Sequence, residues 1–395
     1  MIEKMNSAVW MLLQSLADAG FEAYIVGGSV RDYLLDKQLA DIDITTNATP
    51  EQMMSIFPKA ISINNEHGTV LVRQKNIIAE VTTFRKRCSD QNYTLTFGET
   101  LKEDVSYRDF TMNALAMDRN GVIIDYYDGQ SDLANRTIRA VNNPHERFKE
   151  DPLRMLRAVR FVSELNFTIE KKTLLAIEQL NDRIEHVATE RIKEELSRLI
   201  TGQCAPKAIE LLLKTKLIHY MPIFKYEASF VHYLAKHRRR FISFAHFIAY
   251  MYYQNNSISI SRWVKAWKCS NKEKQDSIIL FEAIERYGRQ GMSNWLIYHL
   301  PERLDKSFVH LIDTLYNKLL DVNELQQFRN KLPIQSRTEL EINGNNLLQY
   351  FPNQQPGAWI EQMLTTIERE VVMNRLPNNE QRIKEWILCH PHETN

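Results

Sequence analysis

Two aspartates separated by one residue are the strongest chemical signal in the first third of the chain. Asp41 and Asp43 lie in the run "DIDIT", whose composition is typical of a β-strand. Alternate strand residues share a face, so the two carboxylates stand on one side, about 6.6 Å apart along the strand. Carboxylates held side by side repel each other unless a cation lies between them. The pattern favours a Mg²⁺ site that the oxygens of a nucleoside triphosphate would complete; an exposed strand edge carrying two acids is the alternative.

A third acid lies in a second apolar run. Glu80 interrupts "IIAEVTTF", where a charged side chain is costly unless it is paired or lies near a metal. It could join Asp41 and Asp43 as a third catalytic carboxylate, or form a structural ion pair with Arg85. The sequence does not decide between these two roles.

A pair of glycines precedes the two aspartates. Gly27 and Gly28 follow the apolar run "AYIV" and precede "SVRDYLL", which indicates the start of a helix. Glycine permits close backbone approach to a ligand, and a helix N-terminus offers free N–H groups to a phosphate. On the glycine pair alone, a tight turn without a ligand is the simpler interpretation, because short glycine motifs give many false matches; it is not a Rossmann fingerprint, since G-x-G-x-x-G is absent.

A group of arginines follows in "EDPLRMLRAVRF". Asp151 and Arg154 are three residues apart, so on a helix they would lie on one turn, followed by a basic stripe through Arg157 and Arg160. Aspartate accepts from an exocyclic amine and arginine donates to a ring acceptor, the pattern that cytosine and adenine present and that uracil and guanine do not. In the alternative interpretation, these arginines only pair with acids such as Glu150 or Glu164.

The chain as a whole has the composition of an ordinary soluble protein. Its 395 residues predict two to four domains, and the net charge of +1 does not indicate a class of partner. No apolar run approaches the roughly 18 residues of a membrane span, and the N-terminus reads as an amphipathic helix. The four cysteines lack metal-site spacing, which suits a reducing cytoplasm.

The pattern of elements changes near residue 143. Before it, short β-type runs alternate with helices, and "GTVLVR" and "IIAEVTTF" predict a hairpin. After it, apolar residues recur at helical spacing to the end of the chain. The sequence therefore predicts an α+β fold with a small mixed sheet, followed by an all-helical remainder in which "YMYYQ", Trp263 and Trp267 belong to the core.

Several motifs in order resemble one known family. After "GGSVRD…DID" come "YRDFTMNALAMD", "DYYDG", "EDPLRMLRAVRF", "ERIKEEL" and "EINGNNLL…PGAWIEQML". Together they are similar to bacterial class II tRNA nucleotidyltransferases, the CCA-adding enzymes, whose head belongs to the DNA polymerase β superfamily. The resemblance covers most of the chain.

The resemblance implies roles for individual residues. Asp41 and Asp43 match Mg²⁺ ligands, and Asp151 with Arg154 matches the pair that reads the incoming base without a nucleic-acid template. The other matches are to nucleotide-binding positions: Gly28, Arg31, Arg108, Asp109, Arg157 and Arg160.

The resemblance also implies an organisation and partners. It predicts a polymerase β-like head over residues 1–143, a helical neck over 144–205, a body over 206–320 and a tail over 321–395. The partners would be CTP, ATP and the acceptor arm and 3′ end of tRNA, with Mg²⁺ as cofactor, in a cytoplasmic homodimer without membrane contact. Basic residues in "KHRRR" (236–240) could contact tRNA phosphates or form a solvated helix face.

Two departures keep other functions open. The segment between Arg85 and Arg108 lacks the "D-x-R-R-P" element of many members, and Tyr107 replaces the usual first arginine of "RRD". In the family this loop is tied to the change from C to A addition, so a CC-adding enzyme is an alternative. The loop's length of roughly twenty residues favours full CCA addition. A bacterial poly(A) polymerase would share the head, and a catalytically inactive RNA-binding protein would keep only the scaffold.

Overall fold

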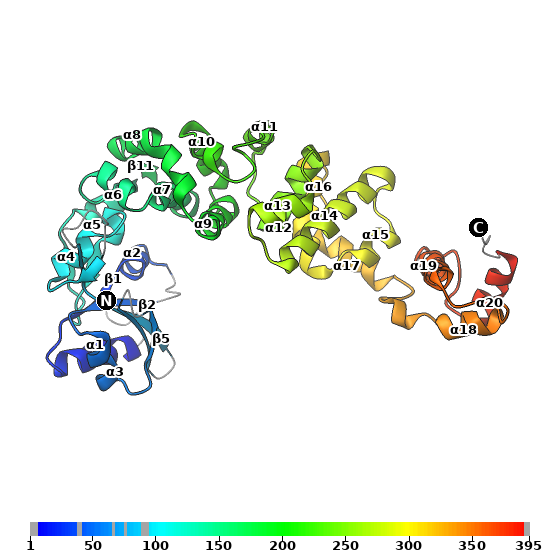
Figure 1. The fold of residues 1–395 in the computed structure, drawn as a ribbon, viewed down its shortest axis with the longest axis horizontal. Coiled ribbons are helices and arrows are strands. Elements are labelled where there is room, and N and C mark those ends of the chain that lie inside the picture. Colours follow the sequence, from blue (N-terminus) through cyan, green and yellow to red (C-terminus); the bar gives the residue numbers. More distant parts are fainter. Residues whose placement is uncertain (1–6, 38–41, 65–67, 75–76, 88–94, 391–395) are drawn as a thin grey trace. The chain divides into compact units, whose positions relative to one another are not determined.

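The computed structural model describes residues 7–37, 42–64, 68–74, 77–87 and 95–390 (Figure 1). The chain forms two compact units, Met1–Val231 and His232–Asn395. The first contains the sheet and the helices around it, and the second is helical. The domain boundaries expected at residues 143, 205 and 320 lie inside these units and stay predictions.

A seven-stranded mixed sheet forms the centre of the N-terminal part. Strands β2 and β5 are parallel, and the other neighbouring pairs are antiparallel. The hairpin of β4 and β5 is confirmed, although residues 75–76 lie outside the described ranges. In sheet order the strands are β3 (Ile61–Asn64), β4 (Thr69–Gln74), β5 (Ile77–Thr83), β2 (Ile42–Thr46), β1 (Ala23–Val26), β8 (Leu115–Met117) and β9 (Ile123–Asp125).

Helices bury the apolar side chains of this sheet. The helix α1 (Ser7–Asp18) packs against β1, β4 and β5 through alanine, valine and leucine side chains at helical spacing. The helix α2 (Gly28–Leu34) packs against β1 and β8, and α3 (Pro50–Ile56) packs against β4. Thr49, the N-cap of α3, forms a capping box with Gln52. The sheet and α2 thus hold the turn at Gly27 in a fixed position.

The segment between Arg85 and Arg108 has defined structure on both sides of residues 88–94, which lie outside the described ranges. Strands β6 (Arg85–Arg87) and β7 (Leu95–Phe97) form a small antiparallel hairpin. Then α4 (Leu101–Ser106) begins with a capping box of Thr100 and Glu103. After β9, Asp125 accepts from the backbone N–H groups of Tyr127, Gly129 and Gln130, and α5 (Gly129–Ala134) follows. The motif "DYYDG" is thus a strand ending in a capped turn.

The remaining elements of the first unit are mainly helical. Helix α7 packs against α9 and α10, and α6 packs against α8. Between them, β10 (Thr137–Ile138) and β11 (Thr168–Ile169) form a short parallel pair. The helices are α6 (Pro144–Glu150), α7 (Leu153–Leu165), α8 (Lys171–Leu180), α9 (Thr189–Thr201) and α10 (Ala205–Lys214), with 3₁₀ turns η2 (Thr111–Asn113), η3 (Asn181–His186) and η4 (Leu217–Tyr220).

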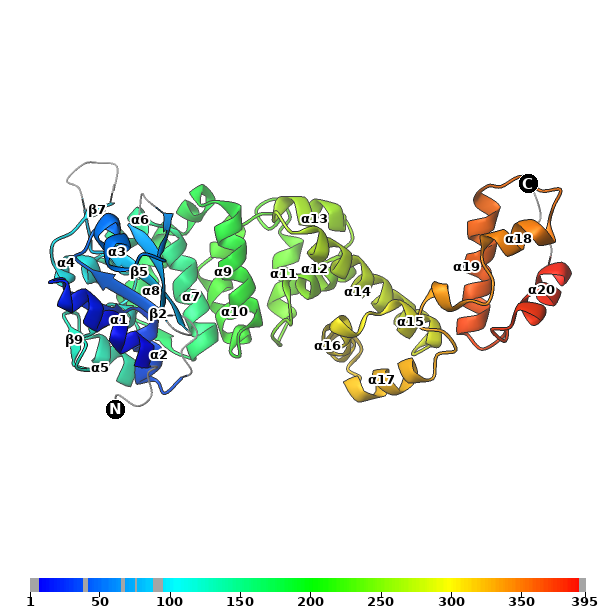
Figure 2. The same ribbon diagram turned by 90° about the horizontal axis from the view of Figure 1, so that it is seen from below.

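The second unit is helical (Figure 2) and has an aromatic core. Trp263, Trp267 and Tyr250 are buried, as the sequence predicted. No described helix is long and apolar enough to cross a bilayer. The helices are α11 (Ser229–Lys236), α12 (Phe244–Gln254), α13 (Ile260–Ala266), α14 (Asn271–Gln290), α15 (Asn294–His299), α16 (Asp305–Tyr316), α17 (Val322–Asn330), α18 (Gly344–Tyr350), α19 (Ala358–Val372) and α20 (Glu380–Cys389), with 3₁₀ turns η5 (Glu302–Leu304) and η6 (Arg337–Glu339).

The basic run "KHRRR" differs from the expectation of a solvated helix face. Helix α11 ends at Lys236, so most of the run follows the helix. His237 is buried, whereas Arg239 forms an ion pair with Asp313 on α16. The three arginines of this run are exposed outside any helix.

Candidate active site

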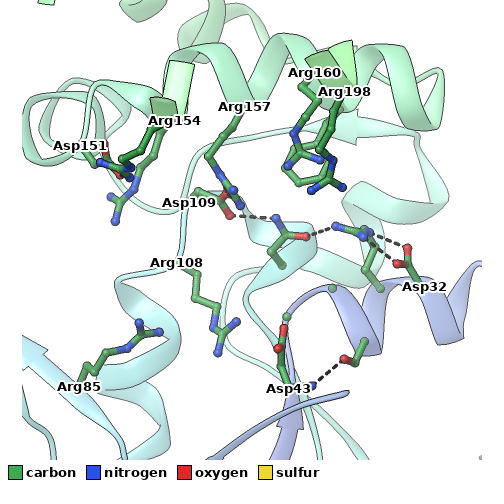
Figure 3. A pocket seen from close by; sticks show the side chains of 17 residues that line it. Asp32, Asp43, Arg85, Arg108, Asp109, Asp151, Arg154, Arg157, Arg160 and Arg198 are labelled. Carbon is green, nitrogen blue, oxygen red and sulfur yellow. Dashed lines mark hydrogen bonds and ion pairs between the residues drawn. The ribbon is translucent and has the colours of Figure 1, made fainter. Parts of the chain in front are cut away.

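A cavity of about 500 Å³ opens between the sheet and the helices α7 and α9 (Figure 3). Its lining has more arginines than aspartates, so the cavity has an excess of positive charge that suits a polyanion. The glycine turn and β2 contribute one part of the lining, and α7 and α9 contribute another. The lining residues are Gly27, Gly28, Ser29, Arg31, Asp32, Asp43, Arg85, Arg108, Asp109, Asn113, Asp151, Arg154, Arg157, Arg160, Phe161, Arg191 and Arg198.

The turn between β1 and α2 requires glycine at its first position. Gly27 has φ of +67°, a conformation that side chains strain, and its N–H donates to the Leu115 carbonyl. A Cβ there would lie 2.4 Å from Arg108 Nη1 and 3.6 Å from Asp43 Oδ2. The missing side chain therefore leaves room for a guanidinium and a carboxylate beside the backbone. Gly28 is the first residue of α2, and its added Cβ would be 3.4 Å from Arg31 Nη2.

The carboxylate of β2 faces this turn. The Asp43 backbone N–H donates to Ser29 Oγ at 3.0 Å, which ties the strand to the first turn of α2. Across the parallel pair, Asp43 is in register with Glu80 on β5. Glu80 is exposed and is not among the described residues that line the cavity, and Arg85 pairs with Asp104 at 3.3 Å. Asp41 lies outside the described residues.

One carboxylate at this position, that of Asp43, suits a divalent cation. A carboxylate at the cavity edge, beside a glycine turn and close to an arginine, is an oxygen donor of the kind that Mg²⁺ prefers. The described residues alone contain no group of three metal-ligating side chains, and Asp41 is not among them. Asp43 would therefore supply one oxygen ligand to such an ion.

A continuous chain of polar contacts joins α2 to the helices α7 and α9. The Arg31 guanidinium donates to both carboxylate oxygens of Asp32, at 2.9 and 2.8 Å. It also donates to Asn113 Oδ1 at 2.7 Å, and Asn113 Nδ2 donates to Asp109 Oδ1 at 2.9 Å. Arg157 Nε then donates to Asp109 Oδ2 at 2.8 Å (Figure 3). One amide thus fixes the positions of an arginine and an aspartate that both line the cavity.

Charge pairing determines the ionisation of Asp109. Burial alone would raise its pKa, but Arg157 and the Asn113 amide hold the pKa of Asp109 at about 2, below its ordinary 3.8. In turn Asp109, and less strongly Glu195, raise the pKa of Arg157 against the effect of burial. Both groups therefore stay charged at neutral pH.

Glu195 on α9 connects two arginines of α7. Its carboxylate accepts from Arg157 Nη1 at 3.2 Å and from Arg160 Nε at 2.5 Å. Arg160 is 2% exposed and also donates to Glu164 Oε2 at 2.6 Å. The Phe161 ring lies near the guanidinium groups of both arginines and of Arg31. The arginines therefore have fixed positions before any ligand binds.

Asp151 and Arg154 lie at the break between α6 and α7. Asp151 Oδ2 accepts from Arg191 Nη2 at 2.8 Å, and its Oδ1 accepts from the Leu153 N–H at 3.2 Å. Arg154 Nη1 donates to Glu150 Oε2 at 3.0 Å. In Figure 3 both side chains lie beside the first turn of α7, with Asp151 just before that helix. An acceptor and a donor thus lie at one end of the cavity.

Comparison with known proteins relates the whole chain to one group. Residues 23–139 match the family model "Poly A polymerase head domain", residues 166–227 match "Probable RNA and SrmB-binding site of polymerase A", and residues 243–387 match "tRNA nucleotidyltransferase domain 2 putative". The CCA-adding enzyme of Oceanobacillus iheyensis is 42% identical over 392 residues, covering 97% of each chain.

Solved structures agree. The Bacillus stearothermophilus CCA-adding enzyme in complex with CTP superposes with a TM-score of 0.89 at 32% identity, covering 97% of each chain. This chain belongs to the CCA-adding enzyme family. A Thermotoga maritima CCA-adding enzyme complexed with tRNA has the same fold, with a TM-score of 0.69 at 19% identity over 99% of this chain and 97% of that one.

Most residues that the family motifs indicated lie together. Within the described residues, the cavity lining includes nine of them: Gly28, Arg31, Asp43, Arg108, Asp109, Asp151, Arg154, Arg157 and Arg160. The alternative for the arginines is also observed, since Arg154 pairs with Glu150 and Arg160 with Glu164. The same arginine side chains therefore form ion pairs and line the cavity.

One local expectation was wrong. Asp151 does not share a helical turn with Arg154, because it is the C-cap of α6, with φ of −142° and ψ of 98°, and α7 begins at Leu153. The residue before a proline is disfavoured in the helical region, and Pro152 follows Asp151. The two side chains still reach one end of the cavity across this break.

Sequence reasoning assigned no role to several lining residues. Asn113 lies inside the motif "YRDFTMNALAMD", and Arg191 and Arg198 are seven apart on α9, a spacing that places them on one helix face. Glu195 lies between them on that helix. For Arg191 and Arg198, the seven-residue spacing was the sequence signal that could have placed them on one helix face.

Proposed function

We propose that this protein adds C, C and A to the 3′ end of tRNA from CTP and ATP and releases pyrophosphate. The observation that carries the proposal is the cavity that brings the glycine turn, Asp43 and the Asp151–Arg154 end together in a member of the CCA-adding family. Each addition forms a bond from the 3′-oxygen to the α-phosphorus, breaks the bond from that phosphorus to the bridging oxygen, which leaves with pyrophosphate, and releases the proton of the 3′-hydroxyl.

The basic lining would bind the triphosphate. Arg108 beside the Gly27 turn and Arg31 on α2 would contact phosphate oxygens, and the turn permits close backbone approach. Asp109 would accept from the ribose hydroxyls while Arg157 holds it in place. Fixed charges of this kind orient the reacting groups and stabilise charge that develops in the transition state.

We propose that Asp41 and Asp43 hold Mg²⁺, with Glu80 as a third acid beside Asp43. When bound, the metal would lower the charge repulsion at the α-phosphate and activate the 3′-hydroxyl. The support is the position of Asp43 at the cavity edge and its register with Glu80.

Asp151 and Arg154 would select the base. Cytosine and adenine each present an amine beside an acceptor on the pairing edge, and the two side chains offer an acceptor and donors. Uracil and guanine would oppose like groups, which leaves polar atoms unpaired at a cost of roughly 1–3 kcal/mol each. The same pair can therefore serve both C and A.

Three alternatives are weighed against this proposal. A poly(A) polymerase shares the head model, but the match of residues 243–387 to a tRNA nucleotidyltransferase domain favours tRNA. A CC-adding enzyme would stop before A; the full-length relatives are CCA-adding enzymes. An inactive RNA-binding protein would have no need for a carboxylate at the Gly27 turn.

The deciding experiment uses a tRNA transcript that ends at the discriminator base. The protein and Mg²⁺ are incubated with CTP alone, ATP alone or both, and the products are sized at single-nucleotide resolution. Two added residues with CTP and three with both nucleotides are expected. A stop at two with both would indicate a CC-adding enzyme, long A tracts from ATP alone would indicate a poly(A) polymerase, and no extension would indicate an inactive protein.

The finer features of the resemblance stay proposals. The head, neck, body and tail boundaries, the cytoplasmic location and the homodimer follow from the family. We propose that the helices after residue 143 grip the tRNA acceptor arm. Analytical ultracentrifugation with and without tRNA tests whether the protein is a homodimer. Binding of tRNA by the purified protein without nucleotides tests whether these helices bind the acceptor arm.

A further inference from the structure

Arg154, the arginine proposed to read the base, is held by three acceptors. Arg154 Nη1 donates to Glu150 Oε2 at 3.0 Å and to the Arg147 carbonyl at 3.3 Å. Its Nη2 donates to the Tyr107 carbonyl at 2.9 Å. These bonds use three of the five N–H groups of the guanidinium and leave the Nε–H and one Nη2–H outside them. The remaining donors are therefore aimed by the bonds that hold the other three.

Glu150 is shared by two arginines. Its Oε1 accepts from Arg147 Nη2 at 2.6 Å, while its Oε2 accepts from Arg154. The Glu150 side chain is only 9% exposed, and the Arg147 side chain is 8% exposed. A carboxylate this buried depends on its cations for stability, and each cation fixes one of its oxygens. A shift of Arg147 would therefore move Glu150 and release Arg154.

Arg147 is itself positioned by the end of α4. Its Nη1 donates to the Ser106 carbonyl at 3.0 Å, and its guanidinium lies 5.6 Å from the centre of the Tyr107 ring. Tyr107 thus contacts Arg147 with its ring and Arg154 with its carbonyl. An aromatic face is a good support for a planar guanidinium.

We propose that Tyr107 and Arg147 are positioning residues that aim Arg154 and so set the discrimination between bases. The proposal rests on the proposed role of Arg154. Neither side chain lines the cavity among the described residues, so both act through Glu150. Loss of the Tyr107 ring removes the aromatic support of the Arg147 guanidinium, so Arg147 can shift on its remaining bonds to the Ser106 carbonyl and Glu150, and Arg154 shifts with it. The cognate base then loses its hydrogen bonds to the two remaining Arg154 donors. A mismatched base forms fewer such bonds, so its incorporation is weakened less.

The test compares incorporation of cytidine and uridine. Purified full-length variants are given a tRNA that ends at the discriminator base, and kcat/KM is measured for CTP and for UTP. In Y107L the CTP/UTP ratio of kcat/KM is expected to fall roughly three- to tenfold. Y107F keeps the ring and is expected to keep the ratio. Because the ratio is independent of the active fraction, partial misfolding does not change it.

A second variant and a matched control make the test decisive. R147K keeps the charge but lacks the planar fork, so the ratio is expected to fall as in Y107L. Y226L removes another ring with a cation above it, the Lys225–Tyr226 pair at 4.8 Å, and is expected to leave the ratio unchanged. If Y107L does not fold, R147K carries the test. A wild-type ratio in Y107L or R147K, or an equal fall in Y107F and Y107L, overturns the proposal.

Failure of the proposed function gives a different result. If the wild-type protein adds no C to tRNA, the function is wrong and the comparison has no reference. If it adds C but R154K keeps the wild-type CTP/UTP ratio, Arg154 does not read the base and the positioning role is wrong with it. If R154K lowers the ratio and Y107L does not, only the positioning role is wrong.

Discussion

Arg157 on α7 and Asp109 after α4 form a close ion pair, with Nε 2.8 Å from Oδ2, that joins the sheet-bearing part of the first unit to its helices. Asp109 is buried, and its pKa of about 2 lies below the ordinary 3.8 because attraction to Arg157 and the Asn113 amide outweighs burial. The folded state thus favours the charged carboxylate. The pair is both a structural contact and a part of the proposed nucleotide site.

The Asp109 pair should make stability depend on acid pH. Because the folded pKa is depressed, its contribution of about 2 kcal/mol is present above about pH 4 and is lost as pH falls through about 2. The free energy of unfolding of wild type should exceed that of D109N by an amount that shrinks over this range. Urea titrations at pH 5 and pH 2.5 measure it, with the exposed substitution D18N as control. A pH-independent difference would contradict the linkage.

The glycine turn should be sensitive at one position and tolerant at the next. G27A places a side chain at φ of +67° and 2.4 Å from Arg108 Nη1, which should destabilise the fold by about 1–3 kcal/mol and raise KM for CTP and ATP. G28A adds a Cβ at ordinary contact distance, so stability should change by about 0.5 kcal/mol or less. Urea unfolding and initial rates measure both. Equal destabilisation by the two substitutions would show that the turn does not depend on Gly27.

Elements with a clear local pattern were predictable from the sequence. The strand "AYIV", the helix beginning at Gly28 and the hairpin of β4 and β5 follow from apolar runs and turn residues. The strand β8 has three residues in a central position between β1 and β9, too short a run to reveal a strand. Its place depends on pairing with distant strands, which local propensity does not encode.

The candidate site was predictable where a motif named its residues, and less so where contacts are long-range. Glu195 pairs with Arg157 and Arg160, which precede it by 38 and 35 residues. No local spacing relates these residues, so only the packing of α9 on α7 reveals the pair. The break at Pro152 was a local signal that the helical periodicity of "EDPLRMLRAVRF" concealed.

The metal ligand and its neighbour should give different phenotypes. D43N removes a proposed Mg²⁺ ligand and should lower kcat by roughly 10²-fold or more. Glu80 lies one strand away in register, about 4.8 Å between backbones, so E80Q should weaken the attraction of the site for a divalent cation by up to about 1.7 kcal/mol. That change raises the Mg²⁺ concentration for half-maximal rate by up to roughly 20-fold.

Magnesium titrations of the rate of C addition separate the two effects. At saturating Mg²⁺, E80Q should recover a rate close to wild type, whereas D43N should not. D18N, which removes a carboxylate outside the cavity lining, serves as the charge control. An unchanged Mg²⁺ requirement in E80Q would exclude Glu80 from the metal site, and a wild-type rate in D43N would overturn the metal assignment itself.

A cluster of buried histidines should make the second unit sensitive to mild acid. Burial, followed by repulsion from His310, lowers the pKa of His237 to about 3 and that of His246 well below its ordinary value. His246 Nδ1 accepts from the Ile242 N–H at 3.2 Å, which requires an unprotonated nitrogen. Because the folded pKa is depressed, each histidine contributes stability above about pH 6.5 that is lost as pH falls toward the folded value.

The variant H237F tests this acid sensitivity. It removes one titrating ring but keeps an aromatic ring to stack on Phe241, whose centroid lies 3.9 Å from that of His237. Between pH 7 and 5, the unfolding free energy of the second unit should fall by about 2 kcal/mol less in H237F than in wild type. H232Q, at an exposed histidine of the same unit, should behave as wild type. Parallel pH dependence in H237F and wild type would mean that His237 takes up its proton without unfolding, and that the aromatic cluster opens to water in the folded state.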